Sequence, residues 1–216
     1  MKKGTETRER ILDIAEAAVL DKGFAGTSIE EIIAEAGITK SGFFYHFRDK
    51  NELALAMVDR FIESNDRLFD DIFARGRELS DDPLQGFLIG LKLMAETLAE
   101  VKKKHPGCIA ASVCYQERLF DRQVVERTRA FTVDWVARFR GYLEEIAETY
   151  PAPDADLDEL AESIVCLIEG GITMSKMMGD VSHLERQVLS YRKIVSMVFT
   201  GRGPALARRP ALLAAE

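Results

Sequence analysis

Residues 39–50 concentrate side chains with which a protein can contact nucleic acid. They read Thr-Lys-Ser-Gly-Phe-Phe-Tyr-His-Phe-Arg-Asp-Lys. Hydroxyl and cationic groups bind phosphate oxygens, and cationic, hydroxyl and apolar groups contact base edges in the major groove. Gly42 would let the backbone approach a groove closely. The contacts that we expect are Lys40, Ser41 and Phe44 at base edges and Tyr45, His46 and Lys50 at phosphates.

Two short helices joined by a tight turn are predicted to present this segment. The Thr-Ser pair at 27–28 and the Glu-Glu pair at 30–31 form two overlapping capping boxes, which begin a helix that ends at Gly37. Two residues later Thr39 can cap the next short helix. This arrangement is a helix-turn-helix. Phe47 is expected to fill the core between these helices, and Phe43 to be either core or groove-facing.

The rest of the chain also shows helical spacing of apolar residues, and no segment shows the sustained alternation of a strand. A first helix is expected from a cap at Thr5 to a stop at Gly23. Asp49 should cap a long fourth helix that runs toward Arg75 and Gly76. Pro83 suits the first turn of the next helix. Asp121 should cap another long helix, and two more are expected at about 155–178 and 182–199. The fold class is therefore all-α.

The sequence of the helix-turn-helix resembles the DNA-binding domain of the TetR/AcrR family of transcriptional regulators. The resemblance rests on Thr-Ser-Ile-Glu-Glu-Ile at 27–32, Ala-Gly-Ile-Thr-Lys-Ser-Gly-Phe-Phe-Tyr-His-Phe at 36–47 and Lys-Asn-Glu-Leu at 50–53, and it spans about residues 6–55. It implies base-edge contacts from Lys40, Ser41, Gly42 and Phe44, and phosphate contacts from Thr27, Ser28, Tyr45, His46 and Lys50. The implied partner is double-stranded operator DNA.

The resemblance also implies a domain organisation. Residues 1–50 would form a three-helix, helix-turn-helix DNA-binding domain, followed by a linking helix from about 50 to 75. Residues 76–200 would form a larger C-terminal helical domain for ligand binding and dimerisation. Residues 201–216 are rich in Gly, Pro, Ala and Arg and are expected to form a disordered tail.

Homodimerisation through the last two helices is a further implication of the resemblance, because family members pair these helices in a four-helix bundle. A twofold dimer would bind a palindromic operator with half-sites ~34 to 36 Å apart. Gly170 and Gly171 would let helices approach closely. A monomeric core could use the same apolar stripes. The residues expected at the interface are Leu160, Ile164, Leu167, Ile168, Leu184, Val188, Tyr191 and Val195.

The expected partner of the C-terminal domain is a small apolar or amphipathic effector. Met and aromatic surfaces accommodate varied apolar ligands, although the same residues could be ordinary helix-bundle core. The residues expected to line a pocket are Phe87, Met94, Trp135, Phe139, Met174, Met177 and Met178.

The three cysteines suggest neither a disulfide framework nor a metal site. Cys108 and Cys114 lie six residues apart, about 120° apart around a helix, which suits no shared metal. Cys108, after Pro106-Gly107, could be exposed at a helix N-terminus and sense oxidants, or it could be buried and inert. We therefore expect no metal and no cofactor.

Composition excludes several other classes of protein. The formal net charge of −7 requires that positive charge for DNA be gathered on one face. The chain has no apolar signal segment and no membrane-spanning stretch, and its scattered cysteines suit the cytoplasm. No catalytic motif is evident, so an enzyme is not expected.

These observations together predict a dimeric, sequence-specific DNA-binding regulator. The expected form is a repressor that a small-molecule effector releases from a palindromic operator. The alternative is a DNA-binding regulator controlled by a protein partner or by cysteine oxidation.

Overall fold

The computed structural model describes residues 2–104 and 107–201, and within these ranges the chain is all-α, as predicted. Residues 202–216 of the expected disordered tail lie outside the described ranges. The elements of the described chain are α1 (Lys2–Lys22), α2 (Ile29–Ala36), α3 (Lys40–His46), α4 (Lys50–Leu79), α5 (Pro83–Lys104), α6 (Ile109–Tyr115), the 3₁₀ turn η1 (Glu117–Leu119), α7 (Arg122–Thr149), α8 (Leu157–Met178) and α9 (Ser182–Thr200).

Local capping fixes the ends of the short helices where the sequence predicted them. Ser28 Oγ accepts a hydrogen bond from the Glu31 amide at 3.1 Å and begins α2. Thr39 Oγ1 accepts from the Gly42 amide at 3.1 Å and begins α3. Between them Gly37 has a φ of +62°, which a residue with a side chain rarely adopts. The tight turn of the predicted helix-turn-helix is therefore present.

Four details of the predicted helices are wrong. Thr5 does not cap α1, because that helix begins at Lys2. The Thr27 side chain is not the cap of α2, because it is buried and donates to the Gly23 carbonyl at 3.0 Å. α4 passes Gly76 and ends at Leu79. Asp121 is the N-cap residue of α7, but its side chain makes no capping hydrogen bond.

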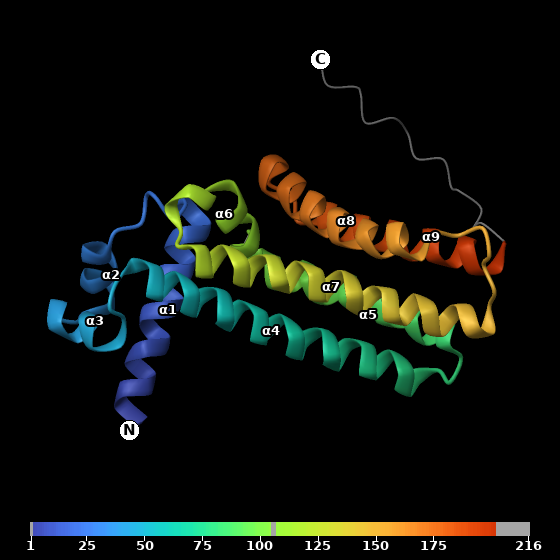
Figure 1. Cartoon of the computed structure of the whole chain (residues 1–216), viewed down its shortest axis with the longest axis horizontal. Helices are drawn as coiled ribbons and strands as arrows, with labels where there is room; N and C mark the ends of the chain where they lie inside the picture. Colours follow the sequence, from blue (N-terminus) through green and yellow to red (C-terminus); the bar gives the residue numbers. More distant parts are fainter. Residues whose placement is uncertain (1, 105–106, 202–216) are drawn as a thin grey trace, which may run out of the picture.

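The long helices lie side by side, with α2 and α3 at one end of the molecule (Figure 1). α4 packs on α5 and α7, and α8 packs on α7 and α9. At the crossing of α4 and α5 a Cβ added at Gly76 would lie 2.4 Å from the Gly86 carbonyl oxygen, so the two backbones approach closely. Helix α4 therefore packs against the bundle and also begins directly after the helix-turn-helix, so it links the two parts of the chain.

The apolar stripes of α8 and α9 serve the interior of the subunit, which corrects their predicted role at a dimer interface. Seven of the eight predicted interface residues are buried in the single chain, since α8 and α9 turn the same stripes toward each other and toward α5 and α7. Leu167 is half-buried. The buried seven are Leu160, Ile164, Ile168, Leu184, Val188, Tyr191 and Val195.

The two adjacent glycines of α8 have different surroundings. A Cβ added at Gly171 would lie 2.9 Å from Leu184 Cα, so this glycine permits the close contact of α8 with α9. Gly170 is exposed, and a Cβ there would meet no atom within 4 Å. Within the subunit, therefore, the packing of α8 on α9 requires a glycine at position 171 but not at position 170.

Candidate DNA interface and effector cavity

Two buried aromatic rings hold α3 against the other N-terminal helices. Phe43 is fully buried and Phe47 is 1% exposed, so both are core residues. Their ring centroids lie 5.8 Å apart, and the Arg8 guanidinium lies 5.1 Å from the Phe47 ring. The prediction for Phe47 is confirmed, and the open question about Phe43 is resolved in favour of the core.

The opposite face of α3 points to solvent and carries the side chains expected to contact DNA. Phe44 is 43% exposed and Tyr45 is 82% exposed, so two consecutive aromatic side chains of α3 are accessible to a partner. Lys40 and Ser41 are exposed as well. Helix α3 therefore presents cationic, hydroxyl and aromatic groups together.

The remaining predicted DNA contacts differ in how far they are accessible. Ser28 is exposed, whereas Gly42 and His46 are half-buried. The His46 ring lies edge-on to Tyr45, with centroids 5.0 Å apart. The predicted side-chain contact from Thr27 is wrong, because this residue is 1% exposed.

Lys50 is held by groups of the protein itself. Its ammonium lies 4.0 Å from the centroid of the Phe24 ring and donates to the Phe24 carbonyl. Burial lowers the pKa of this ammonium. Lys50 thus fastens the start of α4 to the segment between α1 and α2, in addition to any contact with phosphate.

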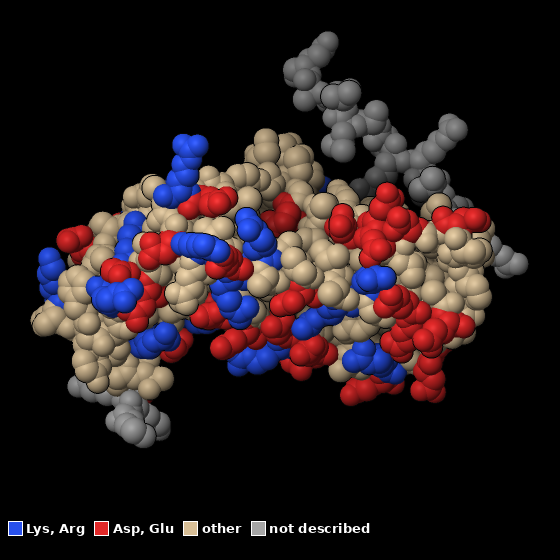
Figure 2. Space-filling view, in the orientation of Figure 1, with Lys and Arg blue, Asp and Glu red and all other residues tan. Residues whose placement is uncertain are grey.

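The charge of the molecule is unevenly distributed. Residues 39–48 contain Lys40 and Arg48 and no carboxylate. In the view of Figure 2, acidic side chains gather at the end of the molecule away from α2 and α3, whereas acidic and basic side chains are mixed at the end where these helices lie. The carboxylate-free residues 39–48 thus form only a local segment, which follows the glutamates of α2.

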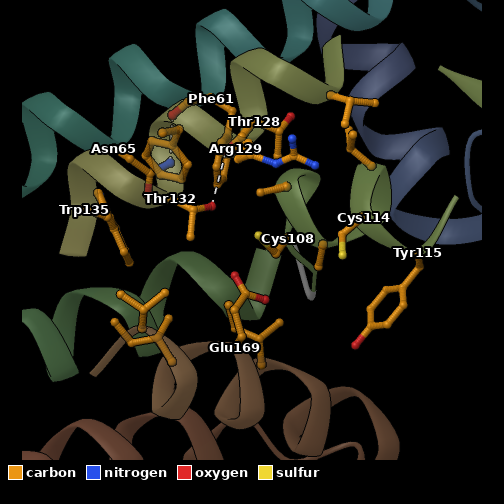
Figure 3. Close-up of a pocket in the computed structure, with 18 of the residues that line it drawn as sticks. Phe61, Asn65, Cys108, Cys114, Tyr115, Thr128, Arg129, Thr132, Trp135 and Glu169 are labelled. Carbon is orange, nitrogen blue, oxygen red and sulfur yellow. Dashed lines mark hydrogen bonds between the residues drawn. The ribbon is translucent and has the colours of Figure 1, made fainter. Parts of the chain in front are cut away.

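A cavity of about 410 Å³ lies among α4, α5, α6, α7 and α8 (Figure 3). Its wall is mostly apolar, which suits a small molecule. Sequence reasoning identified Trp135 and missed the others, because one sequence does not show which helix faces meet. The lining residues are Phe61, Asn65, Leu98, Cys108, Ala110, Ala111, Val113, Cys114, Tyr115, Glu117, Val125, Thr128, Arg129, Phe131, Thr132, Trp135, Val165, Ile168, Glu169 and Ile172.

Six of the seven residues predicted to line a pocket lie outside this cavity. Phe87, Met94 and Phe139 are buried in the helix-bundle core. The three methionines near the C-terminal end of α8 point outward, with exposed fractions of 41%, 74% and 63% for Met174, Met177 and Met178. The prediction is wrong for these six, because composition identifies apolar side chains but not the helix face that carries them.

The two cysteines of the α6 region lie in the cavity wall. Cys108 is 7% exposed, and the adjacent helix α6 begins one residue later. Cys114 is exposed. Among the described residues no group of His, Cys, Asp and Glu side chains is arranged to hold a metal ion.

Two side chains connect the cavity helices to the end of α1. Gln116, which directly follows α6, accepts hydrogen bonds through Oε1 from the Phe24 amide at 3.0 Å and the Ala25 amide at 3.3 Å. Lys176 of α8 donates to the Leu20 carbonyl at 2.8 Å. A displacement of α6 or α8 would therefore be transmitted to the segment that precedes α2.

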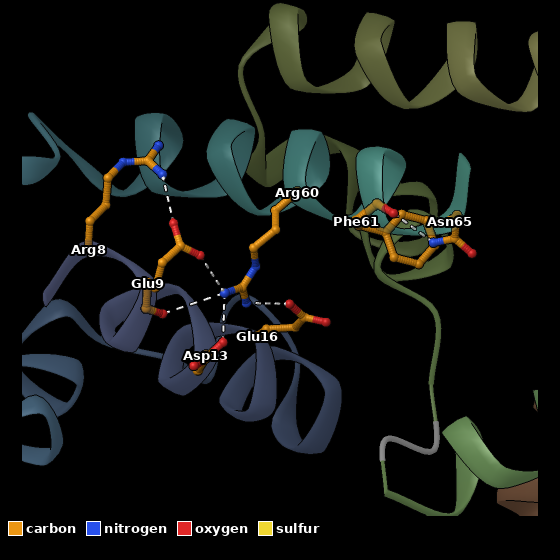
Figure 4. A network of polar contacts seen from close by, with 7 residues as sticks. All are labelled: Arg8, Glu9, Asp13, Glu16, Arg60, Phe61 and Asn65. Atoms are coloured by element: carbon orange, nitrogen blue, oxygen red, sulfur yellow. Dashed lines mark hydrogen bonds and ion pairs between the residues drawn. The ribbon is translucent and has the colours of Figure 1, made fainter. Parts of the chain in front are cut away.

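A second connection joins α1 to α4 (Figure 4). The Arg60 guanidinium forms ion pairs with Asp13 at 2.6 Å, Glu16 at 2.6 Å and Glu9 at 3.4 Å. Although burial opposes its charge, these carboxylates raise the pKa of Arg60 overall. The next residue, Phe61, lines the cavity, so one turn of α4 contacts both α1 and the cavity.

Comparison with known proteins agrees with this architecture. Residues 11–57, from α1 to the start of α4, match the family model described as bacterial regulatory proteins, tetR family. The solved TetR transcriptional regulator of Chloroflexus aurantiacus J-10-FL is 28% identical, with a TM-score of 0.75 over 91% of this chain and 97% of that one. Residues 11–57 therefore form a DNA-binding domain of the tetR family.

Other relatives of the chain are also described as regulators. An uncharacterized HTH-type transcriptional regulator of Lactococcus lactis is 27% identical over 83% of this chain and 88% of that protein. The regulator TtgR of Pseudomonas putida is 38% identical, but over only 37% of this chain and 36% of TtgR. The protein is therefore a transcriptional regulator with a helix-turn-helix DNA-binding domain, and not an enzyme.

One finding bears on the membrane. Across residues 2–104 and 107–201, no helix combines the length and the apolar character that crossing a bilayer requires.

Proposed function

We propose that the protein is a homodimeric repressor that binds a palindromic operator through α3 and leaves it when a small molecule occupies the cavity. The observation that carries the DNA-binding role is the outer face of α3, on which Phe44 and Tyr45 are exposed while Phe43 and Phe47 anchor the helix. Repression would follow from occlusion of the promoter.

For the DNA contacts we retain most of the residues named from the sequence. Lys40, Ser41, Gly42 and Phe44 would contact base edges, with Gly42 allowing the backbone to approach. Ser28, Tyr45, His46 and Lys50 would contact phosphates. Thr27 is removed from this set because its side chain is buried. Residues 1–50 would act as the DNA-binding domain and 76–200 as the regulatory domain, joined by α4.

A corrected surface for the dimer follows from the outward face of α8 and α9. On α8 the exposed positions Cys166, Gly170, Met174 and Met177 repeat at steps of four and three. They carry no charge, and Gly170 offers room for close approach of a second helix. On α9 the exposed apolar residues include Ile194 and Met197, at 41% and 48%. A twofold pairing of these faces would bury them and form a four-helix bundle.

Regulation would use the two connections between the cavity and α1. A ligand that contacts Phe61 displaces the turn of α4 that contains Arg60, and a ligand that displaces α6 moves Gln116. Either movement changes the position of α1 and α2 within each subunit. The separation of the two α3 helices would then no longer match half-sites ~34 to 36 Å apart, and DNA affinity would fall.

Control by cysteine oxidation is a second candidate, since Cys108 and Cys114 both line the cavity. Under this alternative, an oxidant would weaken DNA binding, and serine at both positions would abolish that effect. Control by a protein partner would leave DNA binding insensitive both to oxidants and to cavity ligands.

The DNA-binding role is tested with two tyrosines of equal exposure. Tyr45 on α3 is 82% exposed, and Tyr115 on α6 is 81% exposed. Fluorescence anisotropy would measure binding to the DNA that flanks the gene, at several salt concentrations. Tyr45→Ala should weaken binding about tenfold, because one good DNA contact is worth ~1 to 3 kcal/mol. Tyr115→Ala should leave it unchanged.

Two outcomes would contradict the proposed role of α3. Neither change should alter the melting temperature, because both side chains are exposed. Equal DNA affinity for wild type and Tyr45→Ala, or equal losses for both variants, would show that α3 does not contact the operator as proposed.

A further inference from the structure

The cavity wall offers a ligand acceptors from two threonine hydroxyls and a donor from the buried indole Nε1–H of Trp135, which has no hydrogen-bond partner within the described part of the chain. Thr128 Oγ1 donates its proton to the Val124 carbonyl at 2.9 Å, and Thr132 Oγ1 donates to the Thr128 carbonyl at 3.2 Å. Because each hydroxyl has one proton, both present only lone pairs to a ligand. Asn65 Nδ2 donates to the Phe61 carbonyl at 2.7 Å, and this bond fixes the amide so that its oxygen is turned away from that carbonyl.

A carboxylate completes this wall from the opposite side. Glu169 of α8 lines the cavity and is half-buried. Within the described part of the chain, it has neither a hydrogen bond nor an ion pair. In Figure 3 its carboxylate extends from α8 into the space on the side of Thr132 and Cys108. A ligand that covered Glu169 without a positive charge would remove its hydration and give nothing in return.

The apolar part of the wall includes a cluster of aromatic rings. Phe131 lies 5.5 Å from Phe61 and 5.4 Å from Trp135, measured between ring centroids. Ring faces attract cations as well as apolar groups. The cavity therefore combines an aromatic wall, neutral acceptors and two carboxylates, those of Glu117 and Glu169, of which only that of Glu169 belongs to a half-buried residue.

We propose that the ligand of this cavity is a protonated amine with an apolar or aromatic body, whose ammonium group is held by Glu169. This inference rests on the proposed function, because it names the chemistry of the effector. The ammonium donates to Glu169 and to the hydroxyl oxygens of Thr128 or Thr132, and the apolar body lies against Phe131 and Trp135.

The guanidinium of Arg129 would favour an anionic ligand instead. The exposed position of Arg129 argues against an anion. Arg129 is exposed, whereas Glu169 is half-buried. Glu117, which is also exposed, lines the same cavity. The wall therefore carries two carboxylates against one guanidinium, and among these three groups only the carboxylate of Glu169 belongs to a half-buried residue.

The test compares three compounds that differ only in their polar end: phenylhexylamine, phenylhexanol and phenylhexanoate. Trp135 is the single tryptophan of the chain and lines the cavity, so its fluorescence reports occupancy directly. At neutral pH the amine should bind at least about tenfold more tightly than the alcohol, because a hydrogen bond between charged groups exceeds a neutral one by that factor or more. The acid should bind most weakly.

The matched variants are Glu169→Gln and Glu159→Gln, on the same helix. Glu169→Gln should reduce amine affinity about tenfold and leave alcohol affinity unchanged, because it removes the charge and keeps the shape. Glu159 is exposed and lies outside the cavity, so its variant should behave as wild type. Circular dichroism melting would confirm that both variants are folded.

The proposal is overturned if the alcohol or the acid binds as tightly as the amine, if Glu169→Gln retains amine affinity, or if none of the three compounds changes Trp135 fluorescence. DNA release by the amine is measured separately, by anisotropy of labelled operator. If the amine binds in the Glu169-dependent way and DNA stays bound, the ligand class stands and the proposed release mechanism fails.

Discussion

Replacing Gly76 by alanine should destabilise the protein, whereas the same replacement at Gly141 should stabilise it. Both glycines lie inside long helices, α4 and α7. An added Cβ at Gly76 would lie 2.4 Å from the Gly86 carbonyl oxygen and 3.1 Å from the Gly90 amide nitrogen. At Gly141 it would meet nothing within 4 Å. The pair therefore separates helix propensity from packing.

The expected magnitudes follow from these two terms. Alanine is favoured over glycine inside a helix by about 1 kcal/mol, which is the whole effect at the exposed Gly141. At Gly76 the atoms in the way belong to the backbone of α5, so α4 and α5 must separate. Overpacking of this kind costs up to about 3 kcal/mol, and the net loss is about 2 kcal/mol. For a chain of this length, the melting temperature should fall by about 4–8 °C at Gly76 and rise by about 2–4 °C at Gly141.

Thermal unfolding followed by far-ultraviolet circular dichroism measures both effects. All variants must be compared at one protein concentration, because the melting temperature of a dimer depends on concentration. The double variant should show the sum of the single effects, since the two sites share no contact. A Gly76→Ala protein that melts at or above the wild-type temperature would show that α4 and α5 do not cross as closely as described.

Three further results are expected. A maleimide should modify Cys114 much faster than Cys108, because Cys114 is exposed and Cys108 is only 7% exposed. Mass spectrometry measures both rates, and equal rates would indicate that the α6 region opens. Arg60→Met should lower stability in urea unfolding by about 1–2 kcal/mol at low salt and by less at high salt, because it leaves Asp13 and Glu16 unpaired and Glu9 with Arg8 alone. The same loss at all salt concentrations would contradict this. The hydrogen bond from the Tyr150 hydroxyl holds the pKa of Asp82 below its ordinary 3.8. Wild type should therefore be more stable than Tyr150→Phe above pH 3.8, and this advantage should disappear as the pH falls through the folded-state pKa of Asp82. An advantage that persists in acid would show that it does not come from the ionised Asp82 carboxylate.

The features that could be predicted from the sequence depend on neighbours along the chain. Ser28 and Thr39 bond amides three residues ahead, and Gly37 adopts a positive φ within its own turn, so a local reading finds them. The family resemblance placed Thr27 in the DNA-contact set, but its exposure depends on how the turn folds over its hydroxyl, which neither the resemblance nor the local pattern reports.

The features that could not be predicted depend on which helix faces meet. The stripe that includes Ile164 and Tyr191 has the same spacing whether it packs inside one subunit or between two, and the structure places it inside. Glu169 gave no signal in the sequence, because a glutamate among apolar residues is ordinary on an exposed helix. Only its place opposite Thr128 and Thr132 makes it a candidate ligand-binding group.

The joint formed by Gln116 and Lys176 has a consequence for how such proteins diversify. Both side chains bind main-chain atoms: the amides of Phe24 and Ala25 and the carbonyl of Leu20. Main-chain atoms are common to every sequence, so the joint recognises the path of the backbone at the end of α1 and not the residues that follow it. A helix-turn-helix with other side chains but the same backbone path would form the same hydrogen bonds with Gln116 and Lys176. Side chains at the end of α1 can therefore change without the loss of these three hydrogen bonds, whereas the ion pairs of Arg60 do depend on which residues α1 carries.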